Sequence, residues 1–127
     1  LTDADNSGQA FTDFTKLHFV HSVGGTDYIS QLPITVAANT IYHLKIEIDS
    51  DRKAAIFVNG VQYNVATTAG STGGTAVTAV QPGVQAAKSN ALTNDVDFIP
   101  YNGIEANAGA AEALITHYIC MSRNVYE

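Results

Sequence analysis

The chain has 127 residues and a mass of 13.4 kDa, which fits one domain and leaves no room for two ordinary ones. Six lysines and arginines stand against twelve aspartates and glutamates, so the net charge of −6 argues against a nucleic-acid groove or an anionic membrane surface. The single cysteine, Cys120, excludes an intrachain disulfide and any zinc site made of cysteines alone. No apolar run approaches the ~20 residues that a membrane helix needs.

A β-hairpin is the first element that the sequence predicts. Residues 1–14 are polar and contain glycine, which indicates a loop or a frayed edge. Residues 16–22 and 26–31 are strand candidates, and Val23-Gly24-Gly25 between them has the composition of a tight turn.

The clearest signal lies in residues 41–65. Apolar and polar residues alternate over 42–49, a period of two that is typical of a strand with one apolar face. A polar turn and a second strand over 53–58 follow. Asn59-Gly60 then predicts a hairpin, because a type I′ turn needs positive φ at both central residues. We therefore predict a three-stranded antiparallel meander.

The segment after the meander, residues 66–91, consists mostly of Ala, Thr, Gly, Ser and Val. So long a connection is uncommon in a compact domain. Two interpretations remain open: a surface loop, or an arm that lies on a neighbouring subunit. Exposed sheet edges are normally covered, charged or paired, and no charge lies between Lys53 and Lys88. We therefore expect contacts with another chain to order this arm.

The C-terminal part predicts a short strand over 96–99, which Pro100 ends, and at most one helical turn over 106–113. The last predicted strand covers 113–122. Its two faces are both apolar, which is typical of a buried central strand. One face carries Ile115, His117, Ile119 and Met121, and the other carries Leu114, Tyr118 and Cys120.

Residues 42–54 (YHLKIEIDSDRKA) followed by 57–60 (FVNG) resemble the core meander of concanavalin A-like (laminin G-like) jelly-roll modules. Residues 22–27 (SVGGTD), 98–101 (FIPY) with Gly103-Ile104, and the closing Ser122-Arg123 make the chain similar to such modules in structural proteins of tailed bacteriophages. The resemblance covers roughly residues 15–65 and 92–124. It implies an all-β fold, an antiparallel β-sandwich of jelly-roll type with few or no helices, over residues 1–127. Such modules run longer at the N-terminus, so strands are missing here or are contributed by another chain.

Three acidic residues, Glu47, Asp49 and Asp51, are spaced so that an extended strand would point them the same way, as in jelly-roll glucanases. Those enzymes end their motif with a glutamate, and this chain has no tryptophan to form a sugar platform. Asp49 and Asp51 also suit a hairpin turn, in which short acidic side chains bond backbone amides. We favour the turn and expect no hydrolase activity.

Metal-site candidates are incomplete. Residues 3–8 (DADNSG) resemble the first half of a calcium loop, but its twelfth position is Phe14 rather than glutamate. His18 and His21 are three residues apart on a strand, so they face opposite sides. His43 and His117 are isolated, and Cys120 is interpreted as a small core residue. We assign no catalytic, cofactor-binding or metal-ligating residue and expect no cofactor.

What the resemblance implies for function is a non-enzymatic phage virion structural protein on the particle surface, either a capsid decoration or cement protein or a head-fibre component. The implied partners are other virion proteins and copies of the chain itself, without nucleic acid or membrane. The alternative is a carbohydrate-binding, lectin-like module for host-surface attachment. Its sugar-stacking face would come from the tyrosines, which otherwise serve packing: Tyr28, Tyr42, Tyr63, Tyr101, Tyr118 and Tyr126.

Overall fold

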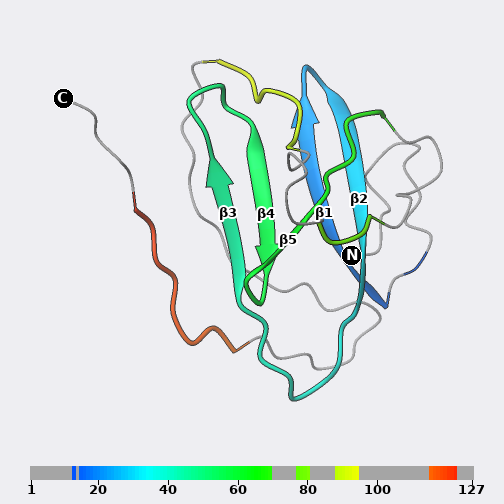
Figure 1. Cartoon of the computed structure of the whole chain (residues 1–127), viewed down its shortest axis with the longest axis vertical. Helices are drawn as coiled ribbons and strands as arrows, with labels where there is room; N and C mark the ends of the chain where they lie inside the picture. Colours follow the sequence, from blue (N-terminus) through cyan, green and yellow to red (C-terminus); the bar gives the residue numbers. More distant parts are fainter. Residues whose placement is uncertain (1–12, 14, 70–76, 81–87, 95–114, 123–127) are drawn as a thin grey trace. The chain divides into compact units, whose positions relative to one another are not determined.

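The computed structural model describes residues 13, 15–69, 77–80, 88–94 and 115–122. The chain divides into two compact units, Leu1–Val96 and Asp97–Glu127. All regular structure among the described residues lies in the first unit and is β-structure in two antiparallel sheets (Figure 1). The strands are β1 (Lys16–Val23), β2 (Thr26–Thr35), β3 (Leu44–Ile48), β4 (Ala54–Val58) and β5 (Val61–Tyr63). The expectation of an all-β, antiparallel fold is confirmed.

The first sheet is the hairpin β1–β2. Its turn is Gly24-Gly25, with φ of 59° and 78°, a left-handed conformation that favours glycine. The strands pair from Val23 opposite Thr26, with an irregularity between Lys16 and His18. The hairpin predicted over residues 16–31 is confirmed and extends to Thr35.

The second sheet has the order β3-β4-β5, so the predicted meander is also confirmed. Asn59 and Gly60 turn β4 into β5 with φ of 50° and 80°, as a type I′ turn requires. The Asn59 side chain also accepts a hydrogen bond from the His43 backbone N–H at 2.9 Å, while the Asn59 N–H donates to the His43 carbonyl at 2.8 Å. These two bonds fix the start of β3 against the end of β4.

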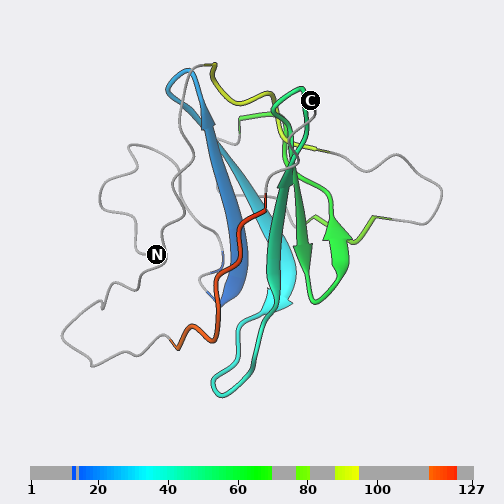
Figure 2. The same ribbon diagram turned by 90° about the vertical axis from the view of Figure 1, so that its left-hand side faces the viewer.

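Both sheets contribute to one hydrophobic core. Figure 2 shows the β1–β2 hairpin beside the sheet of β3, β4 and β5. Leu32 of β2 and Ile56 and Val58 of β4 lie at its centre together with Val65, and each is at most 4% exposed. Partly buried side chains surround this centre: Leu17, Phe19, Ile34, Tyr42, Tyr63 and Val77. The alternating apolar residues of each strand therefore face a partner sheet, as the two-residue period predicts.

The described parts of the 66–91 segment bond to their own chain. Residues 77–80 run beside β5: the Val80 N–H donates to Gln62, and Ala79 bridges Tyr63. Ser89, 2% exposed, donates its backbone N–H to the Ala54 carbonyl at 2.9 Å, and its Oγ accepts from the Ala54 N–H at 2.8 Å. Residues 77–80 and 88–91 therefore have partners within their own chain, and the expectation that a neighbouring chain orders this arm stays a prediction. Residues 70–76 and 81–87 lie outside the described residues.

The predicted buried strand over 113–122 is wrong for the part that is described. Residues 115–122 form no strand, and every one of them is exposed. Ile115 is 78% exposed and Met121 67%, and Cys120 is exposed rather than a core residue. Apolar alternation made this segment compatible with a strand, but a strand also needs a hydrogen-bonding partner. The elements expected over 96–99 and 106–113 lie outside the described residues, as does the half calcium motif over 3–8.

Candidate functional site: the outer edge of β3

β3 is an edge strand: among the described residues it pairs with β4 alone. The bond from the Asp49 N–H to the Lys53 carbonyl and the bond between Asn59 and His43 set the phase of this ladder. Residues 43, 45, 47 and 49 direct their backbone groups toward β4, because such positions alternate along an antiparallel strand. The backbone N–H and C=O groups of Leu44, Ile46 and Ile48 therefore point to the outer side of the sheet.

The side chains of these same three residues continue the core-facing surface of β4. Leu44 pairs with Val58, Ile46 with Ile56, and Ile48 with Ala54, so each pair shares one face of the sheet. The β4 members are 2–4% exposed, whereas Leu44, Ile46 and Ile48 are 63%, 60% and 42% exposed. The hydrophobic core thus covers β4 and stops short of β3. We call the outward backbone groups and these three side chains the β3 edge.

The opposite face of β3 carries one positive and one negative charge. Lys45 Nζ lies 2.5 Å from Glu47 Oε1, and the two side chains are 60% and 54% exposed. Lys45 Nζ also lies 4.8 Å from the centre of the Phe57 ring on β4. An ion pair this exposed adds little to stability, so both charges can exchange their partner at small cost.

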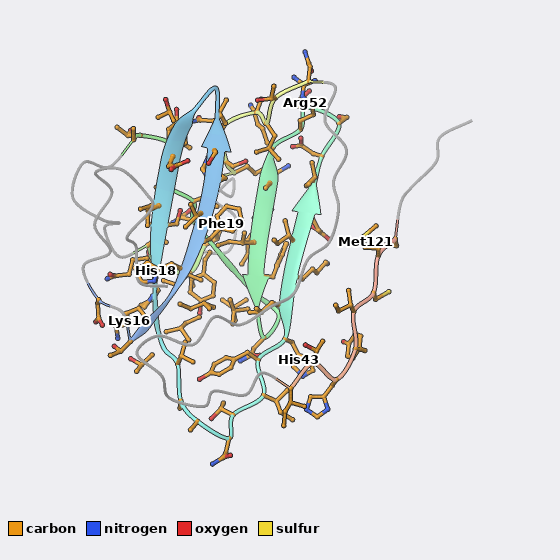
Figure 3. All side chains as sticks on the ribbon, turned by 180° about the vertical axis from the view of Figure 1, so that it is seen from behind. Lys16, His18, Phe19, His43, Arg52 and Met121 are labelled. Carbon is orange, nitrogen blue, oxygen red and sulfur yellow. The ribbon has the colours of Figure 1, made fainter. Side chains whose placement is uncertain are left out.

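Asp49 holds the turn that joins β3 to β4. Its Oδ1 accepts a bond from the Lys53 backbone N–H at 2.9 Å, and its Oδ2 lies 2.9 Å from Lys88 Nζ. The hydrogen bond from Lys88 lowers the pKa of Asp49, and the same bond raises the pKa of Lys88. In this turn Arg52, labelled in Figure 3, takes φ of 60°. It donates from Nε to the Leu92 carbonyl at 2.8 Å.

Two of the three acidic residues with the glucanase-like spacing therefore have structural partners. Glu47 pairs with Lys45, and Asp49 bonds the turn and Lys88. Asp51 lies exposed in the turn itself. The expectation that Asp49 bonds backbone amides in a turn is confirmed.

The histidines do not gather. His18 and His21 occupy alternate positions of β1, opposite Gln31 and Tyr28, so they face opposite sides as expected. His21 is 6% exposed and stacks between Phe19 at 5.7 Å and Tyr28 at 4.8 Å. Burial lowers its pKa, and neither ring nitrogen has a hydrogen-bond partner among the described residues. Within the same residues, no cluster of three or more His, Cys, Asp or Glu could hold a metal ion.

Three of the tyrosines considered for sugar stacking serve packing instead. Tyr28 stacks on His21, Tyr63 packs against the core, and Tyr42 packs there while its hydroxyl donates to Thr35 and accepts from Ala37. Tyr118 is 71% exposed, and Tyr101 and Tyr126 lie outside the described residues.

Comparison with known proteins returned no match to a family model, a curated protein or a solved structure. Among the described residues there is also no helix long and apolar enough to cross a membrane. The β3 edge is therefore identified by its geometry alone. Sequence reasoning recognised the alternating pattern of residues 42–49 but missed this surface. Alternation shows which face of a strand is apolar, and it does not show whether other residues cover that face. The usable signal was the opposite charge of Lys45 and Glu47 on either side of Ile46.

Proposed function

We propose that this chain is a non-enzymatic structural protein of a phage virion, a capsid decoration or cement protein or a head-fibre component that acts through protein–protein contacts. The resemblance of residues 42–60 to meanders of phage jelly-roll modules supports the proposal. The two antiparallel sheets with a shared core are compatible with a jelly-roll β-sandwich, which is the finer fold that we propose.

The observation that carries the proposal is the β3 edge. A core-facing apolar surface that stays 42–63% exposed is what a protein presents when another polypeptide covers it. The outward backbone groups of the same edge, which have no strand partner among the residues that the structure describes, suit an added strand, because β-strand addition supplies hydrogen bonds and side-chain contacts together. A virion protein works inside such an assembly, and its partners would be other virion proteins and further copies of this chain.

The absence of enzymatic activity is part of the proposal. Asp49 bonds the Lys53 N–H in the turn and Lys88, and Asp51 stands near the place where jelly-roll glucanases have the glutamate that ends their motif. We expect no release of reducing sugar from β-glucans by the wild-type chain or by Glu47→Gln. Turnover by the wild type that disappears in Glu47→Gln would overturn this part.

Localisation tests the function directly. Antibodies raised against the chain should label purified particles of the phage that encodes it and should detect the chain in dissociated particles. The matched control is a lysate fraction depleted of particles. Antigen confined to that fraction would contradict the proposal, and binding of the purified chain to an array of host cell-wall glycans would favour the lectin-like alternative instead.

A further inference from the structure

We propose that the β3 edge binds the β3 edge of a second copy, so that two chains form a two-fold symmetric dimer with one continuous sheet. The strand order would be β5-β4-β3-β3′-β4′-β5′, with primes for the second copy. This proposal names a partner and a register, and it does not depend on where in a virion the protein acts.

The backbone of β3 has the right phase for this pairing. Two antiparallel copies related by a two-fold axis at Ile46 place Ile46 opposite Ile46′ and Leu44 opposite Ile48′. These are the residues whose N–H and C=O groups point outward, so each facing pair can exchange both of its hydrogen bonds, about six bonds in all. A register shifted by one residue would turn the apolar side chains of the two copies to opposite faces.

The apolar side chains would form one surface across the axis. Leu44, Ile46 and Ile48 of both copies would lie on the same face, as an extension of the face that Ile56 and Val58 bury in each monomer. Cross-strand contact would cover part of side-chain surface that is 42–63% exposed in the single chain. The hydrophobic effect therefore favours the dimer.

Charge complementarity selects the second copy as the partner. In this register Lys45 lies opposite Glu47′ and Glu47 opposite Lys45′, at the closely spaced pairs that do not exchange hydrogen bonds. A shift by two residues in either direction places Lys45 opposite Lys45′, or Glu47 opposite Glu47′. The segment LKIEI is thus complementary to itself in one antiparallel register only. Beyond its ends, His43 would lie opposite Asp49′.

The strength of the dimer follows from its size. Interfaces that bury less than about 1,200 Å² belong to weak complexes, and a five-residue strand pair is of this kind. We therefore expect a monomer–dimer equilibrium in the micromolar range or weaker. Many copies held close together on one particle would populate such a dimer.

Sedimentation equilibrium of the purified chain tests the proposal through a charge exchange. Lys45→Glu and Glu47→Lys each place like charges opposite each other twice, and each should raise the dimer Kd by about tenfold or more. An equimolar mixture of the two variants restores both opposite-charge pairs and should form heterodimers. The double variant Lys45→Glu/Glu47→Lys should dimerise like the wild type. Val61→Lys, a change at a 43% exposed residue of β5 on the far edge of the sheet, is the matched control and should leave the Kd unchanged.

Ile46→Pro tests the backbone part of the pairing. The Ile46 N–H points outward, so proline removes no bond to β4 but blocks the outer ladder, as it does on natural edge strands. It should abolish the dimer, and circular dichroism should retain the β-sheet signal. If this variant fails to fold, the charge exchange still decides the question.

Three outcomes would overturn the proposal: a wild-type chain that stays monomeric up to about millimolar concentration, a dimer indifferent to both single charge variants, or variants that fail to associate when mixed. The first would mean that the β3 edge does not bind a second copy of the chain. Particle binding by a chain that does not dimerise would leave the proposed function standing. A chain that dimerises in solution but is absent from purified particles would contradict the proposed function and leave the dimer proposal unaffected.

Discussion

β4 and β3 are paired residue for residue, yet they have opposite surroundings. Four of the five residues of β4 are buried, and all five residues of β3 are exposed. Ile56 and Ile46 face each other across the ladder on the same side of the sheet, but one is 4% exposed and the other 60%. Alternation of apolar residues therefore determines which face of a strand is apolar, and the position of the strand in the sheet determines whether that face is covered.

The largest expected effect tests this contrast directly. Ile56→Ala should lower the free energy of unfolding by about 2–5 kcal/mol, because it leaves a cavity in the core. Ile46→Ala, with the same change of side chain, should lower it by less than about 1 kcal/mol. Both are measured by urea denaturation in the Lys45→Glu background, in which the proposed dimer is weakened by about tenfold or more. Equal losses would show that β3 is as well covered as β4.

The turn that follows β4 gives the next effect in size. Gly60 has φ of 80°, and a β-branched residue there is strained wherever its side chain points. Gly60→Val should cost about 1–3 kcal/mol in the free energy of unfolding, visible as a lower melting temperature. Val61→Thr, one residue later on β5, is the matched control and should change the melting temperature much less. An unchanged melting temperature in Gly60→Val would contradict the hairpin.

The buried hydroxyl group of Ser89 is a further difference between the surroundings of β4 and those of β3. Ser89 Oγ accepts a hydrogen bond from the Ala54 N–H at 2.8 Å, at the first residue of β4, and donates to Asn90. Ser89→Ala leaves that buried N–H without its partner and should cost about 1–2 kcal/mol. Thr40→Ala removes an exposed hydroxyl in the loop before β3 and should cost almost nothing. Similar melting temperatures for the two variants would show that the Ser89 bond is dispensable.

The fold was predictable from sequence where short-range signals determine it. Asn59-Gly60 and Gly24-Gly25 fix two hairpins through their backbone conformations, and the alternation over 42–49 defines a strand beside them. The strand over 113–122 failed because its signal was apolar alternation without a turn or partner that would fix its pairing. The intrachain bonds of the segment over 66–91 to Ala54 and β5 could not be predicted, because they come from backbone groups and from Ser89, which carry no hydrophobic period.

The β3 edge shows the same limit for the site. Its charges, its spacing and its strand are all visible in residues 44–48, but its exposure is a property of the whole fold. The core stops at β4 in the described structure, and no local pattern marks that boundary. The role of Asp49 in the turn could be predicted from sequence, because this residue lies where a hairpin turn needs a short acidic side chain. Its bonds to Lys53 and Lys88 confirm that role.

The contrast between covered and uncovered positions extends to two histidines. His43 lies exposed at the start of β3, whereas His21 is buried in the stack between Phe19 and Tyr28. Burial lowers the pKa of His21 below its ordinary value of 6.5, because the charged imidazolium loses its hydration there. The unfolded chain therefore binds this proton more readily than the folded chain.

The sign of the pH dependence follows from linkage. Above about pH 6.5 His21 is neutral in both states and its contribution to stability is fully present; as the pH falls below that value, protonation favours the unfolded chain and the free energy of unfolding decreases. Asp13 and Asp49 affect stability in a lower pH range, because bonds with Thr15 and Lys88 lower their pKa values below 3.8.

Urea denaturation between about pH 8 and pH 5 thus isolates the effect of the histidine. His21→Phe keeps an aromatic ring in the stack and should flatten this slope, while His43→Gln should preserve it. A slope that survives in His21→Phe would place the titrating group elsewhere.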